Sequence, residues 1–146
     1  MKRLLLVTIV IALVLGACAP KAQEPAAGGL KVSDGKVEKT YTAEDLKALG
    51  AVEASVGGVT YVGVTLTVLL NDAGIDPAAL TAVKAVAVDG FTANYDASFY
   101  SREDTIVAYA RADGALAEDE LPFRMVLPDQ GGKMNPRQLT EIIAIP

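Results

Sequence analysis

Residues 59–75 read VTYVGVTLTVLLNDAGI, and the hydrophobic period changes in the middle of this stretch. Up to Thr65 the residues are mostly β-branched or aromatic, which is typical of a strand. From there on the spacing of the leucines is that of a helix, with Thr65 as its N-cap and Gly74 as its stop. The segment therefore predicts a strand that leads directly into a short helix, which buries Leu66, Leu69 and Leu70.

A second alternating run, residues 52–56, precedes the strand at residues 59–62. Only Gly57 and Gly58 separate the two runs. Both glycines tolerate the positive φ that a two-residue primed turn requires. The two runs therefore predict a β-hairpin.

Short strand and helix signals continue on both sides of this hairpin. A first strand is predicted within residues 32–41, after a turn at Asp34-Gly35. Thr42 then begins a capping box for a helix that ends at Gly50. Asp76 and Pro77 open a turn of helix. Further strands are predicted at residues 83–88, 91–95, 106–110, 125–127 and 138–145, the last with burial on both faces. The pattern predicts an α+β fold, a strand-rich single domain with short helices over residues 30–146.

The N-terminus has the proportions of an export signal, with Lys2 and Arg3 before an apolar run. Residues 15–18, LGAC, resemble the lipobox of bacterial lipoproteins, in which the cysteine is diacylated and becomes the new N-terminus. The sequence thus predicts a signal peptide at 1–17, an acylated Cys18 with a flexible tether at 18–29, and an exported protein attached to the cell membrane. Because Ala19 follows the cysteine, the inner and the outer membrane both stay open. The alternative is an uncleaved helix, but the apolar run is short for a span.

Composition excludes several classes of chemistry. The 146 residues include no His, which excludes Ser-His-Asp triads, His-ligated zinc or haem and a histidine pH switch. Cys18 is the only cysteine, so there is no internal disulfide and no CxxC pair. The formal net charge of −5 argues against a nucleic-acid partner, which requires clustered positive charge.

Five segments of the domain follow one another in a recognisable order: YVGVTL and LLNDAGI within residues 61–75, VAVDGF at 86–91, residues 104–109, LPFRMVLP at 121–128, and the last strand at 142–145. In this order they resemble the oxidoreductase molybdopterin-binding domain, the central fold of sulfite oxidases. The resemblance covers about residues 37–145. It implies a sulfite-oxidase-like fold and molybdopterin as the class of cofactor.

The departures from the family pattern concern the metal. Catalytic members ligate molybdenum through a cysteine thiolate, the kind of ligand that soft metals select, and this domain has no cysteine after Cys18. Where catalytic members tend to carry a His, this chain has Glu120 or its neighbours. The family's Trp before the last strand is replaced by residues 133–136, KMNP. The resemblance therefore implies a short member that keeps the fold and loses the metal chemistry.

Three cations fall within fourteen residues, around a glycine pair that can present backbone N–H groups to an anion. We predict a small-anion site from these residues: Arg124, Gly131, Gly132, Lys133 and Arg137. The alternative interpretation is that the cations are solvated surface charges and the glycines an ordinary turn. Arg124 lies between apolar neighbours, so packing or a carboxylate partner is expected to hold it.

Two further segments receive structural interpretations. Asp89 and Gly90 are interpreted as a turn and Phe91 as a core residue. The acidic run Glu118 to Glu120 is interpreted as a solvated turn, because it lacks the ordered ligand spacing of a calcium loop.

Three hypotheses for function follow. The first is a membrane-anchored, non-catalytic module that binds a small anionic ligand or an envelope protein, with no metal or catalytic residue assigned. The second is a molybdopterin-dependent oxidoreductase component that binds its cofactor through Arg124 and the loop at residues 131–133. The third is a structural lipoprotein without a ligand.

Overall fold

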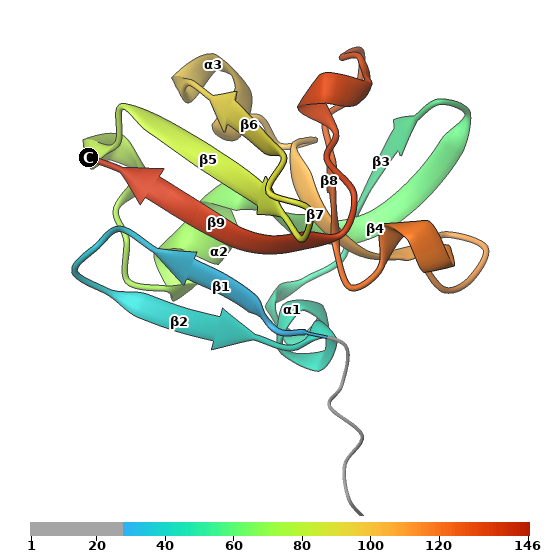
Figure 1. Ribbon diagram of the computed structural model, residues 1–146, viewed down its shortest axis with the longest axis horizontal. Helices are drawn as coiled ribbons and strands as arrows, with labels where there is room; N and C mark the ends of the chain where they lie inside the picture. The colour runs from blue at the N-terminus through green and yellow to red at the C-terminus, as the bar shows by residue number, and fades with distance from the viewer. Residues whose placement is uncertain (1–27) are drawn as a thin grey trace, which may run out of the picture.

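Two β-sheets build the domain in this computed structural model, which describes residues 28–146 (Figure 1). One sheet has the strand order β2-β1-β9-β5-β6 and the other β3-β4-β7-β8. The single parallel pairing recorded in these two sheets joins β1 to β9. The strands are β1 (Leu30–Ser33), β2 (Glu38–Tyr41), β3 (Val52–Val56), β4 (Val59–Thr65), β5 (Ala82–Ala87), β6 (Thr92–Tyr95), β7 (Ile106–Arg111), β8 (Arg124–Val126) and β9 (Leu139–Ile145).

Short helices fill the connections between these strands. They are the α-helices α1 (Ala43–Leu49), α2 (Leu66–Asp72) and α3 (Ala97–Tyr100), and the 3₁₀ helices η1 (Pro77–Ala79), η2 (Glu118–Glu120) and η3 (Gly132–Met134). The predicted class, a strand-rich α+β single domain, is confirmed. Among the described residues, no helix has the length and apolar character needed to cross a membrane. The predicted signal peptide and Cys18 lie outside the described residues.

The strand-to-helix segment forms as predicted. Strand β4 runs into α2 at Thr65, whose Oγ1 accepts a hydrogen bond from the N–H of Val68. The three leucines of α2 are completely buried. Gly57 and Gly58 both have positive φ, 60° and 80°, and close the β3–β4 hairpin. Local backbone requirements explain why this segment was predictable.

The strand predicted after the Asp34-Gly35 turn forms as β2, but strand β1 before the turn was not predicted, and the two pair as a hairpin. The Asp34 carboxylate accepts the N–H groups of Lys36 and Val37, and Gly35 has a φ of 84°. The chain reverses at this turn, so β1 and β2 lie antiparallel. The helix after it, α1, has the predicted capping box between Thr42 and Asp45.

Three other expectations differ from the structure. Burial in β9 alternates, since Ile142 and Ala144 are buried while Ile143 is only partly covered, so one face of the strand carries the core. Helix α3, which Asp96 caps, was not predicted from the sequence. Phe91 is 41% exposed and is not a core residue, because it directly follows the tight Asp89-Gly90 turn at the sheet's end.

The core has two parts. The larger part packs α1 and α2 against the five-stranded sheet and strands β4, β7 and β8. A smaller cluster lies on the four-stranded sheet and consists of Ala54, Tyr61, Ile106, Ala108, Leu116 and Val126. Strands β7 and β8 contribute to both clusters. They therefore fix the positions of the residues at their ends, among them Arg111 at the end of β7 and Arg124 at the start of β8.

Candidate functional site

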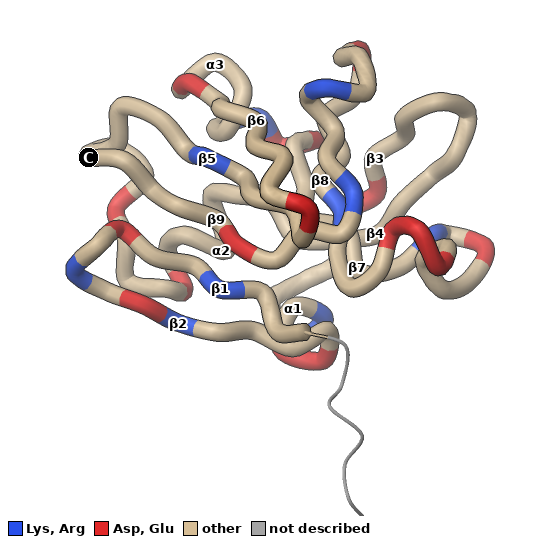
Figure 2. The backbone as a smooth tube through the Cα atoms, viewed as in Figure 1, with Lys and Arg blue, Asp and Glu red and all other residues tan. Residues whose placement is uncertain are grey.

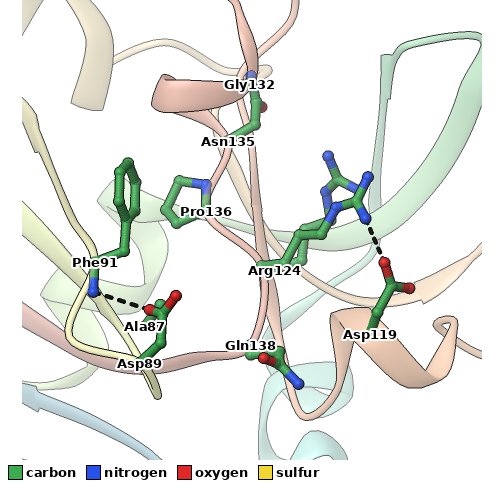
Figure 3. A pocket seen from close by; sticks show the side chains of 10 residues that line it. Ala87, Asp89, Phe91, Asp119, Arg124, Gly132, Asn135, Pro136 and Gln138 are labelled. Carbon is green, nitrogen blue, oxygen red and sulfur yellow. Dashed lines mark hydrogen bonds and ion pairs between the residues drawn. The ribbon is translucent and has the colours of Figure 1, made fainter.

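Two adjoining cavities, of about 360 and 440 Å³, form a cleft beside β8 and the segment that precedes β9. Four residues line both cavities: Asp119, Arg124, Gly132 and Arg137. We call this the arginine cleft. Figure 3 shows Asp89 and Phe91 on one side of the first cavity and Asp119 and Arg124 on the other. Both volumes fall in the range of small-molecule sites.

The inner wall of the second cavity is a cluster around a buried carboxylate, that of Glu120, which is 1% exposed. Its Oε1 accepts hydrogen bonds from Tyr61 Oη at 2.7 Å and from Arg124 Nη1 at 2.5 Å. Its Oε2 accepts from Arg111 Nε at 3.0 Å and Nη2 at 2.8 Å, and from the Ala117 N–H at 3.0 Å. We call these residues the Glu120 cluster.

Strand pairing places the partners of Glu120. Tyr61 on β4 lies opposite Arg111 at the end of β7, and Arg124 at the start of β8 lies opposite Ala108 of β7. The Tyr61 ring contacts both guanidinium groups, with ring-centroid distances of 4.6 Å to Arg124 and 5.8 Å to Arg111. In Figure 2 the acidic segment of η2 lies beside the ends of β4 and β7. The cluster therefore joins four elements, of which β4 is distant in sequence from the other three.

The ionisation of Glu120 reflects these contacts. Burial raises the pKa of a carboxyl group, but the hydrogen bonds from Tyr61, Ala117, Arg124 and Arg111 outweigh burial and lower the pKa of Glu120 to about 2. Burial and the bond to Glu120 raise the pKa of the Tyr61 hydroxyl. At neutral pH the cluster thus contains two cations and one anion.

Stability is expected to fall in acid because of this group. The lowered pKa means that Glu120 stabilises the fold fully above its ordinary pKa of 4.5, and that this contribution disappears as the pH falls toward about 2. Its size is about 3 kcal/mol. Urea unfolding of the wild type and Glu120→Gln between pH 7 and pH 2 measures it. The difference in unfolding free energy between the two should shrink with falling pH, and a constant difference would contradict the assignment.

The interpretation of residues 118–120 as a solvated acidic turn was wrong for Glu120. Asp119 and Glu118 are exposed, but Glu120 is buried. In a 3₁₀ turn each residue points about 120° from the one before it, so three consecutive acids cannot all face water. The available signal in the sequence was Arg124, four residues later, whose apolar neighbours already implied that it needs a carboxylate partner.

The outer part of the cleft carries a different ion pair. Arg137 donates a hydrogen bond to Asp119, and both side chains are more than half exposed. Such a pair is weak, about 0–1 kcal/mol, and solvent competes with it. The guanidinium of Arg137 is therefore available to a ligand at low cost, unlike that of Arg111 or Arg124.

The glycine loop is held by Asn135, which is 3% exposed and which the sequence analysis missed. Its Nδ2 donates to the carbonyls of Leu127, Gln130 and Gly131, and its Oδ1 accepts from the Leu127 N–H. Gly132 lines both cavities. Of the five predicted anion-site residues, the structure brings Arg124, Gly132 and Arg137 together in the cleft. Gly131 and Lys133 line neither cavity.

Arg124 is 6% exposed and is held as predicted, by a carboxylate. Its Nη1 also donates to Tyr61 Oη at 2.8 Å. Its Nε has no hydrogen-bond partner among the described residues, although the atom is buried. An unpartnered buried donor is unfavourable by about 1–3 kcal/mol. The side chain of Arg124 is thus not saturated by Glu120.

The comparisons with known proteins agree with this fold. The family model described as oxidoreductase molybdopterin binding domain matches residues 32–146. Among solved structures, the chain is similar to a chain of the sulfane dehydrogenase SoxCD from Paracoccus pantotrophus, with a TM-score of 0.64 and 20% identity. That alignment covers 81% of this chain and 38% of the SoxCD chain. No curated protein matches the chain.

Proposed function

Because the chain belongs to the oxidoreductase molybdopterin-binding domain family, we propose that it is a non-catalytic member that binds a small anion in the outer part of the arginine cleft. The observation that supports the proposal is the exposed Arg137 pair beside a cluster with surplus positive charge. The two cavities together are lined by three arginines (Arg111, Arg124, Arg137) and three carboxylates (Asp89, Asp119, Glu120), so the lining as a whole carries no net charge at pH 7. The local surplus lies in the Glu120 cluster, where two arginines face one carboxylate, and an anion would bind beside it through Arg137.

Family membership implies molybdopterin as the cofactor class, and the residues present do not fit a thiolate-held metal. Residues 28–146 contain neither Cys nor His, and the described residues contain no group of three side chains suited to ligate a metal. The buried Glu120 also places a negative charge against the two inner arginines. Because Glu120 already pairs with these arginines, binding of an anion by hydrogen bonds and charge falls to Arg137 in the outer part of the cleft.

Inorganic phosphate is the probe for this proposal. At constant ionic strength, phosphate is expected to raise the melting temperature of the wild type in a saturable way. Arg137→Gln is expected to weaken the apparent affinity about tenfold, as removal of one charge-assisted hydrogen bond of about 1.5 kcal/mol would. Lys133→Gln is the control, because it removes one exposed charge outside the cleft and should leave the affinity unchanged.

Equal loss in both variants would mean that only net charge matters and would contradict a site in the cleft. The oxidoreductase alternative is tested separately, on protein from a host that makes molybdenum cofactor. There, native mass spectrometry of the full chain compared with its denatured mass would reveal a bound pterin. Such an adduct would replace this proposal by the enzyme hypothesis.

The second part of the proposal is membrane attachment through a lipid on Cys18. A diacylated cysteine provides many buried CH₂ groups, at about 0.8 kcal/mol each. Residues 18–29, even when fully extended, reach about 40 Å, so the domain would stay near the membrane surface. Cys18→Ser is expected to abolish acylation, and labelling with radioactive palmitate together with membrane fractionation checks this. Unchanged labelling would refute the attachment site.

A further inference from the structure

We propose that the Glu120 cluster is a carboxylate-binding site that the chain fills with its own side chain. Glu120 would then be an internal ligand, and the site would accept small monocarboxylates once that side chain is removed. This inference goes beyond phosphate binding at Arg137. It concerns the inner wall of the cleft and needs no ligand in the wild type.

The first support is the arrangement of donors. Each oxygen of a carboxylate accepts more than one hydrogen bond, and here all the donors that surround Glu120 converge on its two oxygens. Oε1 accepts from Tyr61 and Arg124, and Oε2 from Arg111 and the Ala117 N–H. Five donor atoms lie between 2.5 and 3.0 Å from the two oxygens. A planar carboxylate with two oxygens is thus the group that this arrangement matches.

The second support is that the backbones of three of the four partners are positioned independently of Glu120. The backbones of Tyr61, Arg111 and Arg124 are fixed by the ladders of β4, β7 and β8. Their side chains also hold one another, since both guanidinium groups stack on the Tyr61 ring and Arg124 donates to Tyr61 Oη. Glu120 itself comes from η2, outside both sheets. Removing its carboxylate therefore leaves the three backbones and the bond between Arg124 and Tyr61 in place, and an incoming carboxylate would again pair with Arg111.

The third support is charge. Arg111 and Arg124 face one carboxylate, and Arg124 Nε keeps an unpartnered buried N–H. A buried cation without a counter-charge is strongly unfavourable. Without Glu120, two cations would share the site, so the affinity for any anion of the right shape is high. Glu120→Ala removes a CH₂ and a carboxylate, which together have the size of acetate.

Chemical rescue of Glu120→Ala by acetate tests the proposal on the full chain. The melting temperature is measured in sodium acetate and in sodium chloride at equal ionic strength and pH 7. Acetate is expected to raise the melting temperature of Glu120→Ala by about 5 °C or more, with saturation. The matched control is Glu120→Gln, which loses the same charge but keeps the space filled. Any acetate binding at Arg137 is common to all three proteins, so the stabilisation of Glu120→Ala by acetate should exceed that of this control and of the wild type.

If Glu120→Ala does not fold in chloride, refolding from urea replaces the melting experiment. The proposal then predicts a higher refolding yield in acetate than in chloride for Glu120→Ala, and equal yields for Glu120→Gln. Equal behaviour of Glu120→Ala in both salts, in melting or in refolding, would overturn it. The phosphate experiment with Arg137→Gln uses the wild-type cluster, so either proposal can fail while the other stands.

Discussion

Arg124→Met is expected to lower the free energy of unfolding by about 3–5 kcal/mol, because it leaves part of a buried ion-pair cluster uncompensated. The methionine has a similar length and preserves the packing against the Tyr61 ring. What it removes is the charge and the hydrogen bonds from Nη1 to Glu120 and Tyr61. Glu120 keeps Arg111 as its cation, which favours the lower end of that range.

Urea unfolding at pH 7 measures this effect, with Arg137→Met as the matched control. The Arg137 pair with Asp119 is exposed, so the same substitution there should change the free energy of unfolding by less than about 1 kcal/mol. A neutral or stabilising effect of Arg124→Met would show that the burial of Arg124 is as unfavourable as its ion pair is favourable. That result would also contradict the argument that Arg111 and Arg124 require a carboxylate between them.

Gly63→Ala is expected to lower the free energy of unfolding by about 3 kcal/mol, at the upper end of the range for overpacking. A Cβ on Gly63 would lie 2.2 Å from the carbonyl oxygen of Val107 and 2.7 Å from the Cα of Ala108. Both atoms belong to the backbone of β7, so no side-chain rotation can relieve the contact. The strand pairing of β4 and β7 is also irregular between Val62 and Gly63.

Gly131→Ala is the control for this substitution. An added Cβ at Gly131 meets no atom within 4 Å, and the φ of −68° suits any residue. Denaturant unfolding should therefore show a change within about 0.5 kcal/mol for Gly131→Ala. If Gly63→Ala were equally neutral, β4 and β7 would be able to move apart locally at little cost in free energy. The close contact between these two strands would then not be required for stability.

The elements that sequence analysis predicted well are those that depend on neighbours along the chain. The Gly57-Gly58 turn, the Thr42 capping box and the Thr65 cap each depend on residues within a few positions. The segments that resemble the molybdopterin-binding family, and their order, can also be recognised from the sequence alone. The absence of His and of any cysteine after Cys18, which limits the metal chemistry of the domain, is likewise fixed by composition.

The errors arose where burial depends on distant partners. An acidic run is normally solvated, and only the tertiary structure shows that Glu120 meets Tyr61, 59 residues away, together with two arginines. The same holds for Phe91, which a hydrophobic pattern assigns to the core but which lies exposed beside the cleft.

Composition and local pattern by themselves thus determined the strands, the caps and the chemistries that this domain lacks. Tertiary structure alone decided which cations share a cleft, bringing Arg124 and Arg137 to it while Lys133 lines neither cavity. The physical reason is that a charge can be buried only where opposite charges and donors converge on it. That convergence comes from the pairing of β4, β7 and β8, which no short stretch of the sequence encodes.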